Sequence, residues 1–365
     1  MKAYIWTLPT RIFHWLLALY ILIAFLSSEE ENLLTIHAAV GYGIGVLVLF
    51  RLIWGFWGPR YSRFRDWPLS IKEAIDYIFH ITRPKKLYPG HNPAAALVMM
   101  GIIVVTFFSV LTGLLAYGIQ EGRGILAFLH SPLFKEMEIF EEVHEFFTTL
   151  LLLLIGAHLA GVALDYLLHK DQKTYLSIFT GYKNIDAPSA ALTPIQKVIA
   201  TILLTLALLT PIAALNSSLT GSIYAPIEYE EEHSAFFEEC GSCHTLYPPF
   251  LLPARSWQKM MANLEDHFGD DASLDEPTRK SIENFLTQRS AEFSTKEAAV
   301  YILSSLKSAT PLAITETPYW KAKHAQIDDT IFTSKKVRSK ANCKACHTHI
   351  EKGLIEDDQI TLPKI

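Results

Sequence analysis

The sequence predicts an all-α protein in which a bundle of membrane-spanning helices is followed by a mostly α-helical domain outside the membrane. Three observations lead to this prediction. Five apolar segments reach the length of about 20 residues that a helix needs to cross a bilayer. Few stretches show the alternating pattern of a strand. All four cysteines of the 365-residue chain lie in its second half, in two short motifs, so we expect this half to fold separately.

The five apolar segments are predicted to be transmembrane helices. They cover residues 11–28, 36–57, 93–117, 143–168 and 195–222. The first is short and needs its flanking aromatic residues to span. Trp6, Trp15, Trp54 and Trp57 suit the headgroup zone of a bilayer. No small-residue cleavage site follows the first segment, so we expect it to be retained as a membrane anchor.

The charges of the loops predict the orientation, because Lys and Arg collect on the cytoplasmic side of a membrane. The connection 58–91 carries seven cations against three acidic residues, whereas the loop before the second segment carries Glu29, Glu30 and Glu31. We therefore expect a multi-pass protein of a bacterial inner membrane, with the N-terminus in the cytoplasm and the domain after about residue 224 in the periplasm. Within the cytoplasmic connection, SIKEAIDYIFH begins with a capping box and predicts a short helix on the membrane surface.

Net charge is unevenly distributed along the chain. Residues 1–223 hold 16 cations and 15 acidic residues, whereas residues 224–365 hold 16 and 22, a net charge of −6. A mildly acidic second half argues against nucleic-acid binding and fits a docking partner with a basic surface.

Two copies of the pattern C-x-x-C-H lie in the second half, as CGSCH at 240–244 and CKACH at 343–347. This is the attachment signature of c-type haem, in which two cysteines form thioethers with the haem and the adjacent histidine coordinates its iron. A zinc site or two disulfides would use the cysteines but would not need a histidine after each pair. We therefore predict two covalent c haems, and the residues that hold them are Cys240, Cys243 and His244, and Cys343, Cys346 and His347.

Each c haem also needs a second axial ligand or an open position on its iron. His349 is too close to His347 to reach the opposite face of the same haem. The Met260–Met261 pair lies in a helical pattern where packing explains it. His267 and His324 remain the better candidates, and the sequence leaves open which of them serves which haem.

The fourth apolar segment contains His144 and His158, although histidine is costly in lipid and is therefore a functional suspect there. A rise of about 1.5 Å and a turn of about 100° per residue place the two about 21 Å apart on one helix face. His14 and His37 begin the first and second segments, at depths that match His158 and His144. Two such pairs are what two stacked b haems need, each with two imidazoles on its iron. A hydrogen-bonded structural role is the alternative for any one of these histidines alone.

Other polar residues near the membrane have simpler interpretations. We expect surface or interfacial positions for four further histidines: His80, His91, His130 and His169. Three arginines are candidates to pair with haem propionates, with snorkelling as the alternative: Arg11, Arg51 and Arg123.

Three stretches of the first half, TLPTRIFHW, TIHAAVGYGIGVLVLFRLIWGFWG and VHEFFTTLLLLLIGAHLAG, resemble the bacterial cytochrome b561 family, also found as hydrogenase-type cytochrome b subunits. The resemblance covers about residues 1–183. It implies a four-helix haem-binding bundle with two non-covalent b haems. The ligands that it implies are those paired above: His14, His37, His144 and His158.

Three stretches of the second half, ECGSCHTLYPPFLLPARSWQKMMANLEDHFGDDASLD, ITETPYW and SKANCKACHTHIEKGLI, resemble the dihaem cytochrome c family. The resemblance covers residue 236 to the end and implies that both c haems are bis-histidine. His267 lies in the first stretch and His324 follows the second, so the resemblance implies these two as the remaining ligands. Members of this family are often found beside a separate cytochrome b and a small periplasmic haem protein.

These features predict three parts of the chain. They are a cytochrome b561-like membrane domain (1–185), a fifth transmembrane helix with a linker (186–227) and a periplasmic dihaem cytochrome c domain (228–365). Four haems would form an electron path from membrane quinol through two b and two c haems to a soluble periplasmic haem protein or other acceptor. The protein would be an electron carrier with quinol:cytochrome c-type oxidoreductase activity and no catalytic side chain.

Two alternatives remain open from the sequence. In the first, electrons run inward to quinone from a periplasmic donor such as superoxide. In the second, the helices only anchor a cytochrome c subunit of a larger complex. Quinol-driven reduction of the c haems separates the main prediction from the first alternative, and the presence of b haem separates it from the second.

Overall fold

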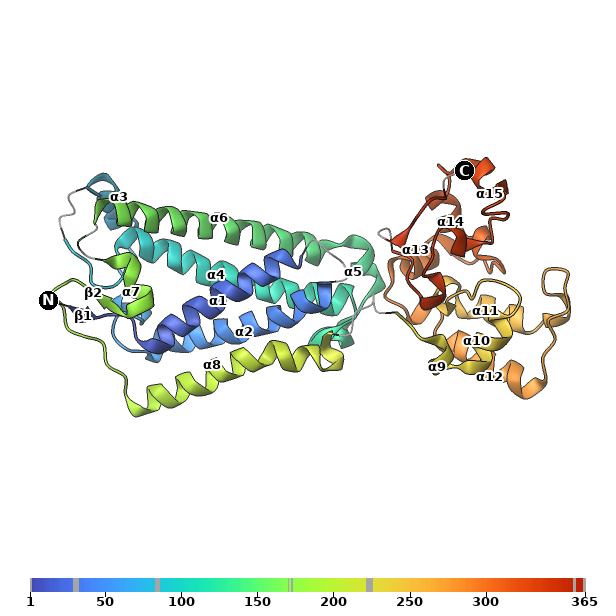
Figure 1. Ribbon diagram of the computed structural model, residues 1–365, viewed down its shortest axis with the longest axis horizontal. Coiled ribbons are helices and arrows are strands. Elements are labelled where there is room, and N and C mark those ends of the chain that lie inside the picture. Colours follow the sequence, from blue (N-terminus) through green and yellow to red (C-terminus); the bar gives the residue numbers. More distant parts are fainter. Residues whose placement is uncertain are drawn as a thin grey trace. The chain divides into compact units, whose positions relative to one another are not determined.

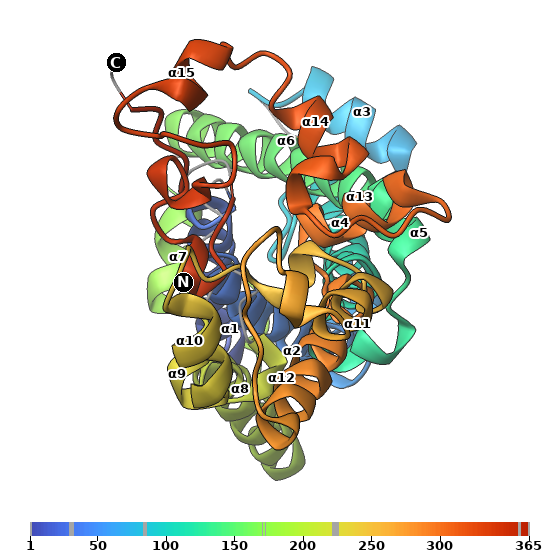
Figure 2. The ribbon, with the colours of Figure 1, turned by 90° about the vertical axis from the view of Figure 1, so that its right-hand side faces the viewer.

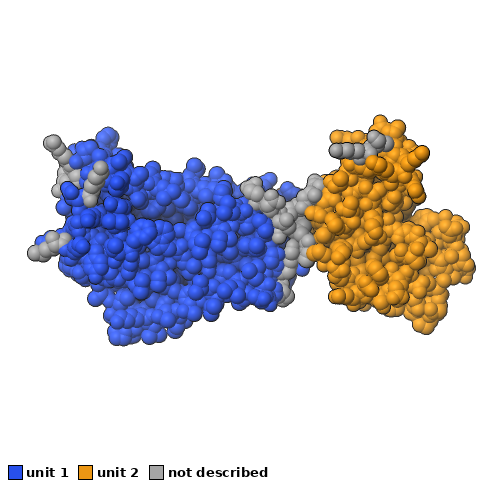
Figure 3. Space-filling view, in the orientation of Figure 1, with its two compact units in different colours: residues 1–130, 138–221 blue, residues 131–137, 222–365 orange. Residues whose placement is uncertain are grey.

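The structure is a computed structural model that describes residues 2–28, 33–82, 86–169, 171, 173–220, 226–356 and 359–363. The chain divides into two compact units, of which the first contains residues 1–130 and 138–221 and the second residues 131–137 and 222–365 (Figure 3). Both are helical apart from one pair of two-residue strands, so the predicted all-α class is confirmed. Part of the charge pattern that predicted the orientation lies outside the described residues: Glu29, Glu30, Glu31, Arg83 and Lys85.

Five helices of the first unit are long and apolar enough to cross a membrane, which confirms the five predicted segments (Figure 1). They are α1 (Leu8–Leu26), α2 (Leu34–Trp57), α4 (Pro93–Leu115), α6 (Ile139–Leu168) and α8 (Pro194–Leu215). The largest shift in bounds is at the end of α8, which stops seven residues before the predicted end. A π-helical turn, Ala116–Gln120, extends α4.

Local sequence signals explain where these helices begin. The Asn92 side chain accepts a hydrogen bond from the amide of Ala95 at 2.8 Å and caps α4, whose first residue is a proline. Thr193 and Gln196 form a capping box at the start of α8. Ser70 caps the predicted short helix, α3 (Ile71–Phe79). The apolar residues of α3 are exposed, and its location on a membrane surface stays a prediction.

The fifth helix, α8, is part of the core of the first unit. It packs along α1 and α2, and the Tyr20 hydroxyl donates a hydrogen bond to the carbonyl of Ala207 at 3.1 Å. Gly43 permits the close approach, because a Cβ there would lie 2.8 Å from both Pro211 and Tyr20. Seen end-on, α8 and α6 lie on opposite sides of α1, α2 and α4 (Figure 2).

Helix α6 has much less protein around it than the other spans. It packs against α4. Only 6 % of the residues in its most apolar 18-residue stretch are buried inside the protein, compared with 44 % for α2. Lipid covers part of such a helix, but α6 also carries two of the predicted ligands. Its sparse cover leaves room for a non-protein group beside it.

A small sheet closes one end of the first unit. Strand β1 (Ala3–Tyr4) pairs antiparallel with β2 (Tyr182–Lys183), so that Ala3 lies opposite Lys183. The amides of Ile5 and Trp6 both donate to the carbonyl of Gly181, which has a φ of +88°. This pairing, together with α7 (Thr174–Thr180), brings Lys183 against the bundle.

The second unit consists of short helices around two hydrophobic clusters. Cys240 packs on a cluster that contains Phe236 and Trp257, and Cys343 packs on another that contains Ile302. Pro318 begins one of these short helices, because Pro is well suited to a first helical position. The helices are α5 (Pro132–Met137), α9 (Tyr229–Glu232), α10 (Ser234–Gly241), α11 (Ala254–Met261), α12 (Glu276–Gln288), α13 (Glu297–Leu306), α14 (Pro318–Lys323) and α15 (Asp329–Thr333).

Candidate haem-iron centres

The four histidines of the membrane unit lie in two pairs. His14 on α1 faces His158 on α6, with ring centroids 6.3 Å apart and ring planes at 62°. His37 on α2 faces His144 on α6, with centroids 6.1 Å apart and planes at 87°. These are the pairs that matched depths suggested from the sequence.

The spacing within each pair leaves room for one metal atom. Metal–imidazole bonds are about 2.0 Å long and a ring nitrogen lies about 1.1 Å from the ring centre, so two imidazoles on opposite sides of a metal have centroids about 6.2 Å apart. A direct hydrogen bond between two rings would bring the centroids to about 5 Å. The observed distances match the first arrangement.

Backbone carbonyls orient one nitrogen of each ring of the His37–His144 pair and leave the other nitrogen of each ring for a metal. His37 Nδ1 lies 2.9 Å from the carbonyl oxygen of Ala24, and His144 Nδ1 lies 2.9 Å from that of Ser109. A carbonyl accepts only from a protonated nitrogen, so Nε2 of each ring keeps its lone pair. Such a second bond is the usual support of a metal-ligating histidine.

The space beside the pairs fits a wide planar group. Gly41 lies one helical turn after His37, and a Cβ built there would meet no atom within 4 Å. The same is true of Gly156 and Gly161, which flank His158 on α6. Together with the sparse cover of α6, these openings fit two macrocycles between the helices.

Two buried cations near the His14–His158 pair also fit haem. Arg51 is 7 % exposed and Lys183 is 4 % exposed, and Arg51 Nη1 has no hydrogen-bond partner among the described residues. Loss of hydration lowers the pKa of Lys183 to about 8, and its Nζ donates to a neutral acceptor, the carbonyl oxygen of Gly90, at 2.9 Å. Buried cations need an anionic partner, and the carboxylates of a haem supply one.

His91 places these cations close to the His14–His158 pair. The sequence suggested a surface or interfacial position, and the structure leaves His91 partly buried between Trp6 and Trp67, with ring centroids 4.9 and 4.6 Å away. Loss of hydration lowers its pKa to about 3, helped by the charges of Lys183, Arg51 and His158. Three distant segments meet around His91, which no local pattern of the sequence indicates.

The second unit forms two further histidine pairs with the same spacing. His244 and His267 have ring centroids 6.1 Å apart and planes at 21°. His347 and His324 have centroids 6.2 Å apart and planes at 55°. The sequence left open which candidate belongs with which motif, and the geometry puts His267 with the first and His324 with the second.

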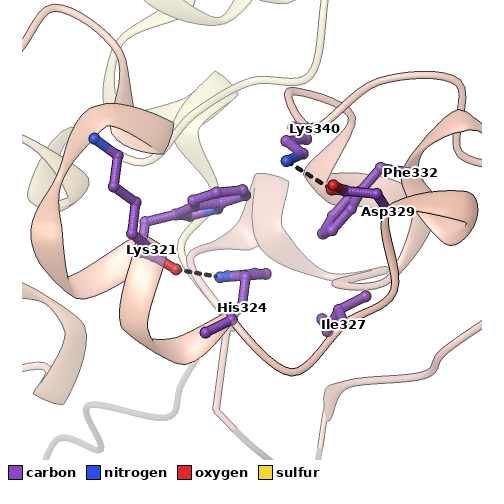
Figure 4. A pocket seen from close by; sticks show the side chains of 8 residues that line it. Lys321, His324, Ile327, Asp329, Phe332 and Lys340 are labelled. Atoms are coloured by element: carbon purple, nitrogen blue, oxygen red, sulfur yellow. Dashed lines mark hydrogen bonds and ion pairs between the residues drawn. The ribbon is translucent and has the colours of Figure 1, made fainter.

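The surroundings of the second motif show how one such histidine is held. His324 Nδ1 lies 2.9 Å from the carbonyl oxygen of Trp320, whose indole stacks on the His324 ring at 4.4 Å. The ring lines a pocket of about 260 Å³ together with Phe332 and Lys340 (Figure 4). Burial lowers the pKa of His324, which favours the neutral, metal-binding form.

The four cysteines have free thiols, so the structure does not support the disulfide alternative. Among the described residues, no group of three or more metal-binding side chains forms a bare metal site, which a structural zinc would need. Burial raises the pKa of Cys240 to about 12 and that of Cys343 to about 11, because each lies in an apolar cluster. Met261 is 3 % exposed in the first cluster, where it packs as predicted.

Comparisons with known proteins bear on both units. Residues 5–181 match the prokaryotic cytochrome b561 family, and residues 236–355 match the dihaem cytochrome c family. The second unit is 42 % identical to the dihaem cytochrome c of Rhodobacter sphaeroides, a match that covers that whole chain and 36 % of this one, with a TM-score of 0.32. This chain is a cytochrome b561 domain fused to a dihaem cytochrome c domain.

Two further relatives of this b561–dihaem fusion are each similar to one part of the chain. The second unit is 36 % identical to the dihaem cytochrome c of Shewanella baltica, over 94 % of that chain and 36 % of this one, with a TM-score of 0.30. The first is 26 % identical over 153 residues to the "Probable Ni/Fe-hydrogenase 1 B-type cytochrome subunit" of Escherichia coli, which is 35 % of this chain and 65 % of that protein. The chain thus spans just under two thirds of that relative's length. Both predicted resemblances are confirmed.

Proposed function

We propose that the b561–dihaem fusion carries electrons from membrane quinol through two b haems to two c haems, and from there to a soluble acceptor. A membrane cytochrome b joined to a dihaem cytochrome c is a pairing suited to electron transfer. The observation that carries the proposal is the spacing of four histidine pairs, all between 6.1 and 6.3 Å.

The proposed ligands would leave every iron with two imidazoles and no open position. The b haems would lie between His14 and His158 and between His37 and His144. Haem supplies one-electron exchange when bound, and the protein tunes its potential through ligands, burial and nearby charge. The residues of this chain orient the imidazoles, exclude water and offer cations to the propionates. With no open position, small-molecule binding at iron is disfavoured and electron transfer is favoured.

The c haems would be attached through Cys240 and Cys243 at the first motif and Cys343 and Cys346 at the second. Their surroundings differ in charge. Residues 226–275 hold eleven acidic and two basic residues, whereas residues 320–352 hold three acidic and eight basic ones. We propose the acidic region as the exit toward a basic acceptor, because opposite charges steer encounter.

The proposed orientation follows the positive loops. The end of the bundle formed by β1, β2, α3 and α7 would face the cytoplasm, and the dihaem domain would lie in the periplasm. Electrons would then leave the membrane on the periplasmic side.

A substitution of Lys183 tests the proposed b haem between His14 and His158. We expect Lys183→Met to lower the midpoint potential of one b haem by on the order of 50–100 mV, because loss of a nearby cation favours the ferric form. The other three haems should keep their potentials. Redox titration in the visible region measures this, and Lys183→Arg, which keeps the charge, is the matched control. Unchanged potentials of both b haems in Lys183→Met would contradict the assignment.

Quinol-driven reduction tests the electron path itself. Purified protein mixed anaerobically with a short-chain quinol should show reduction of the b haems first and of the c haems afterwards, in one stopped-flow trace. The order follows from the location of the b haems in the membrane and of the c haems outside it. C haems that stay oxidised at the end of the trace, after the b haems are fully reduced, would contradict the path.

A further inference from the structure

The membrane unit has an apolar groove between α1, α7 and α8. Its volume is about 490 Å³, and its apolar lining includes Ile12 and Trp15 of α1, Phe179 of α7, and Leu204 and Leu208 of α8. Pockets for organic ligands commonly lie between about 300 and 1,000 Å³. Two of these residues belong to the fifth helix, which lies outside the residues matched by the b561 family. The groove therefore depends on the added helix.

One polar side chain at the groove has an unused donor. Arg11 donates through Nη1 to the carbonyl of Phe179. Its Nε is buried and has no hydrogen-bond partner among the described residues. A buried N–H without an acceptor costs about 1–3 kcal/mol, so this position favours a ligand with an oxygen acceptor. Arg11 lines the groove as its one cation, so its guanidinium N–H groups suit a carbonyl or hydroxyl oxygen of a ligand.

Aromatic rings connect the groove to the His14–His158 pair. Trp15 packs on Phe179 with centroids 4.7 Å apart and planes at 35°, which gives a wall suited to a planar ring. Trp15 also contacts His14 edge to face, with the two ring centroids 5.0 Å apart. A ligand against Trp15 is thus one side chain away from a proposed iron ligand.

We propose that this groove is the quinol site of the protein, with the guanidinium of Arg11 donating to a ring oxygen and the isoprenoid tail along Leu204 and Leu208. This rests on the proposed function. Oxidation of one quinol to quinone releases two electrons and two protons. A haem held between His14 and His158 would accept the electrons one at a time past Trp15, in its ferric form, and would pass them to the other haems. The protons go to water at the Arg11 end of the groove.

The length and chemistry of the groove favour quinol over phospholipid. The lining residues of α1 run from Leu8 to Leu19, about 16 Å of helix, which accommodates several isoprenoid units. A phosphate would bring a full negative charge and its hydration to a groove with one cation and otherwise apolar walls. A quinol ring needs only one donor and flat apolar contacts.

Variants that fill the groove test the proposal. Leu208→Trp and Ile12→Trp place an indole in it, at positions 53 % and 43 % exposed where the core is not disturbed. We expect at least a tenfold rise in KM for quinol-driven haem reduction, with unchanged dithionite-reduced spectra. Arg11→Gln should raise KM several-fold. Leu209→Trp is the matched control, since Leu209 is 52 % exposed on the same helix and lies outside the groove lining, and it should behave as wild type.

The outcomes separate this proposal from the one on which it rests. Wild-type quinol kinetics in both filled variants would overturn the groove assignment and leave the electron path standing. Loss of co-purified phospholipid from Leu208→Trp with unchanged quinol kinetics would make the occupant a lipid and would also overturn it. If the wild-type protein itself is not reduced by quinol, the proposed function fails instead.

Discussion

His144→Ala will reduce the b-haem content from two to one per chain and leave both c haems attached. In the proposed arrangement only axial ligands and packing would hold each b haem, so removal of one imidazole of the His37–His144 pair should release that haem. Thioether bonds hold the c haems whatever happens in the membrane unit. Pyridine haemochrome spectra of the purified variant measure both contents.

Electron paramagnetic resonance identifies which b haem is lost. The ring planes of His37 and His144 lie at 87°, and two imidazoles at this angle on one iron would make the orbitals that face them nearly equal in energy and would produce a strongly anisotropic low-spin signal. That signal should disappear in His144→Ala. His80→Ala is the matched control, because His80 is an exposed histidine of the same unit that bonds only within α3. Two b haems in His144→Ala would show that His144 is not a ligand.

His324→Ala will leave both c haems attached, but the iron of one of them will lose an axial ligand and gain an open coordination position. The covalent attachment at Cys343 and Cys346 keeps the second haem in place, while its iron loses the imidazole that faces His347 at 6.2 Å. We expect half of the c haem to become high-spin and to bind carbon monoxide, which the wild-type protein should not do. Difference spectra of the reduced protein with and without carbon monoxide measure this fraction.

His349→Ala provides the control for this experiment. His349 is only two residues from His347 and does not pair with it across the proposed haem, so its loss should leave both c haems six-coordinate. If His324→Ala also leaves both c haems low-spin and closed to carbon monoxide, another residue is the ligand and the pairing of the second motif is wrong.

Features that depend on local sequence were predictable. Long apolar runs predicted all five spanning helices, because length and hydropathy are properties of one segment. The matched depths of His14 with His158 and of His37 with His144 follow from helical rise alone. The C-x-x-C-H motifs are local as well, so the attachment residues could be proposed before the structure.

Features that depend on contacts between distant segments were not predictable. The pairing of β1 with β2 joins residues about 180 positions apart and brings Lys183 into the bundle end, which no local pattern indicates. His91 is partly buried by Trp6 and Trp67 from two other segments. Helix α8 matched neither family pattern, and its packing on α2 needed the contact at Gly43.

The count of haems in detergent-purified protein tests the central claim most directly. Pyridine haemochrome spectra, referred to the protein concentration, give the amounts of b and c haem per chain. The four histidine pairs predict two b and two c haems. Two c haems with no b haem would leave His14, His37, His144 and His158 without an iron, and the protein would then be a cytochrome c with a membrane anchor.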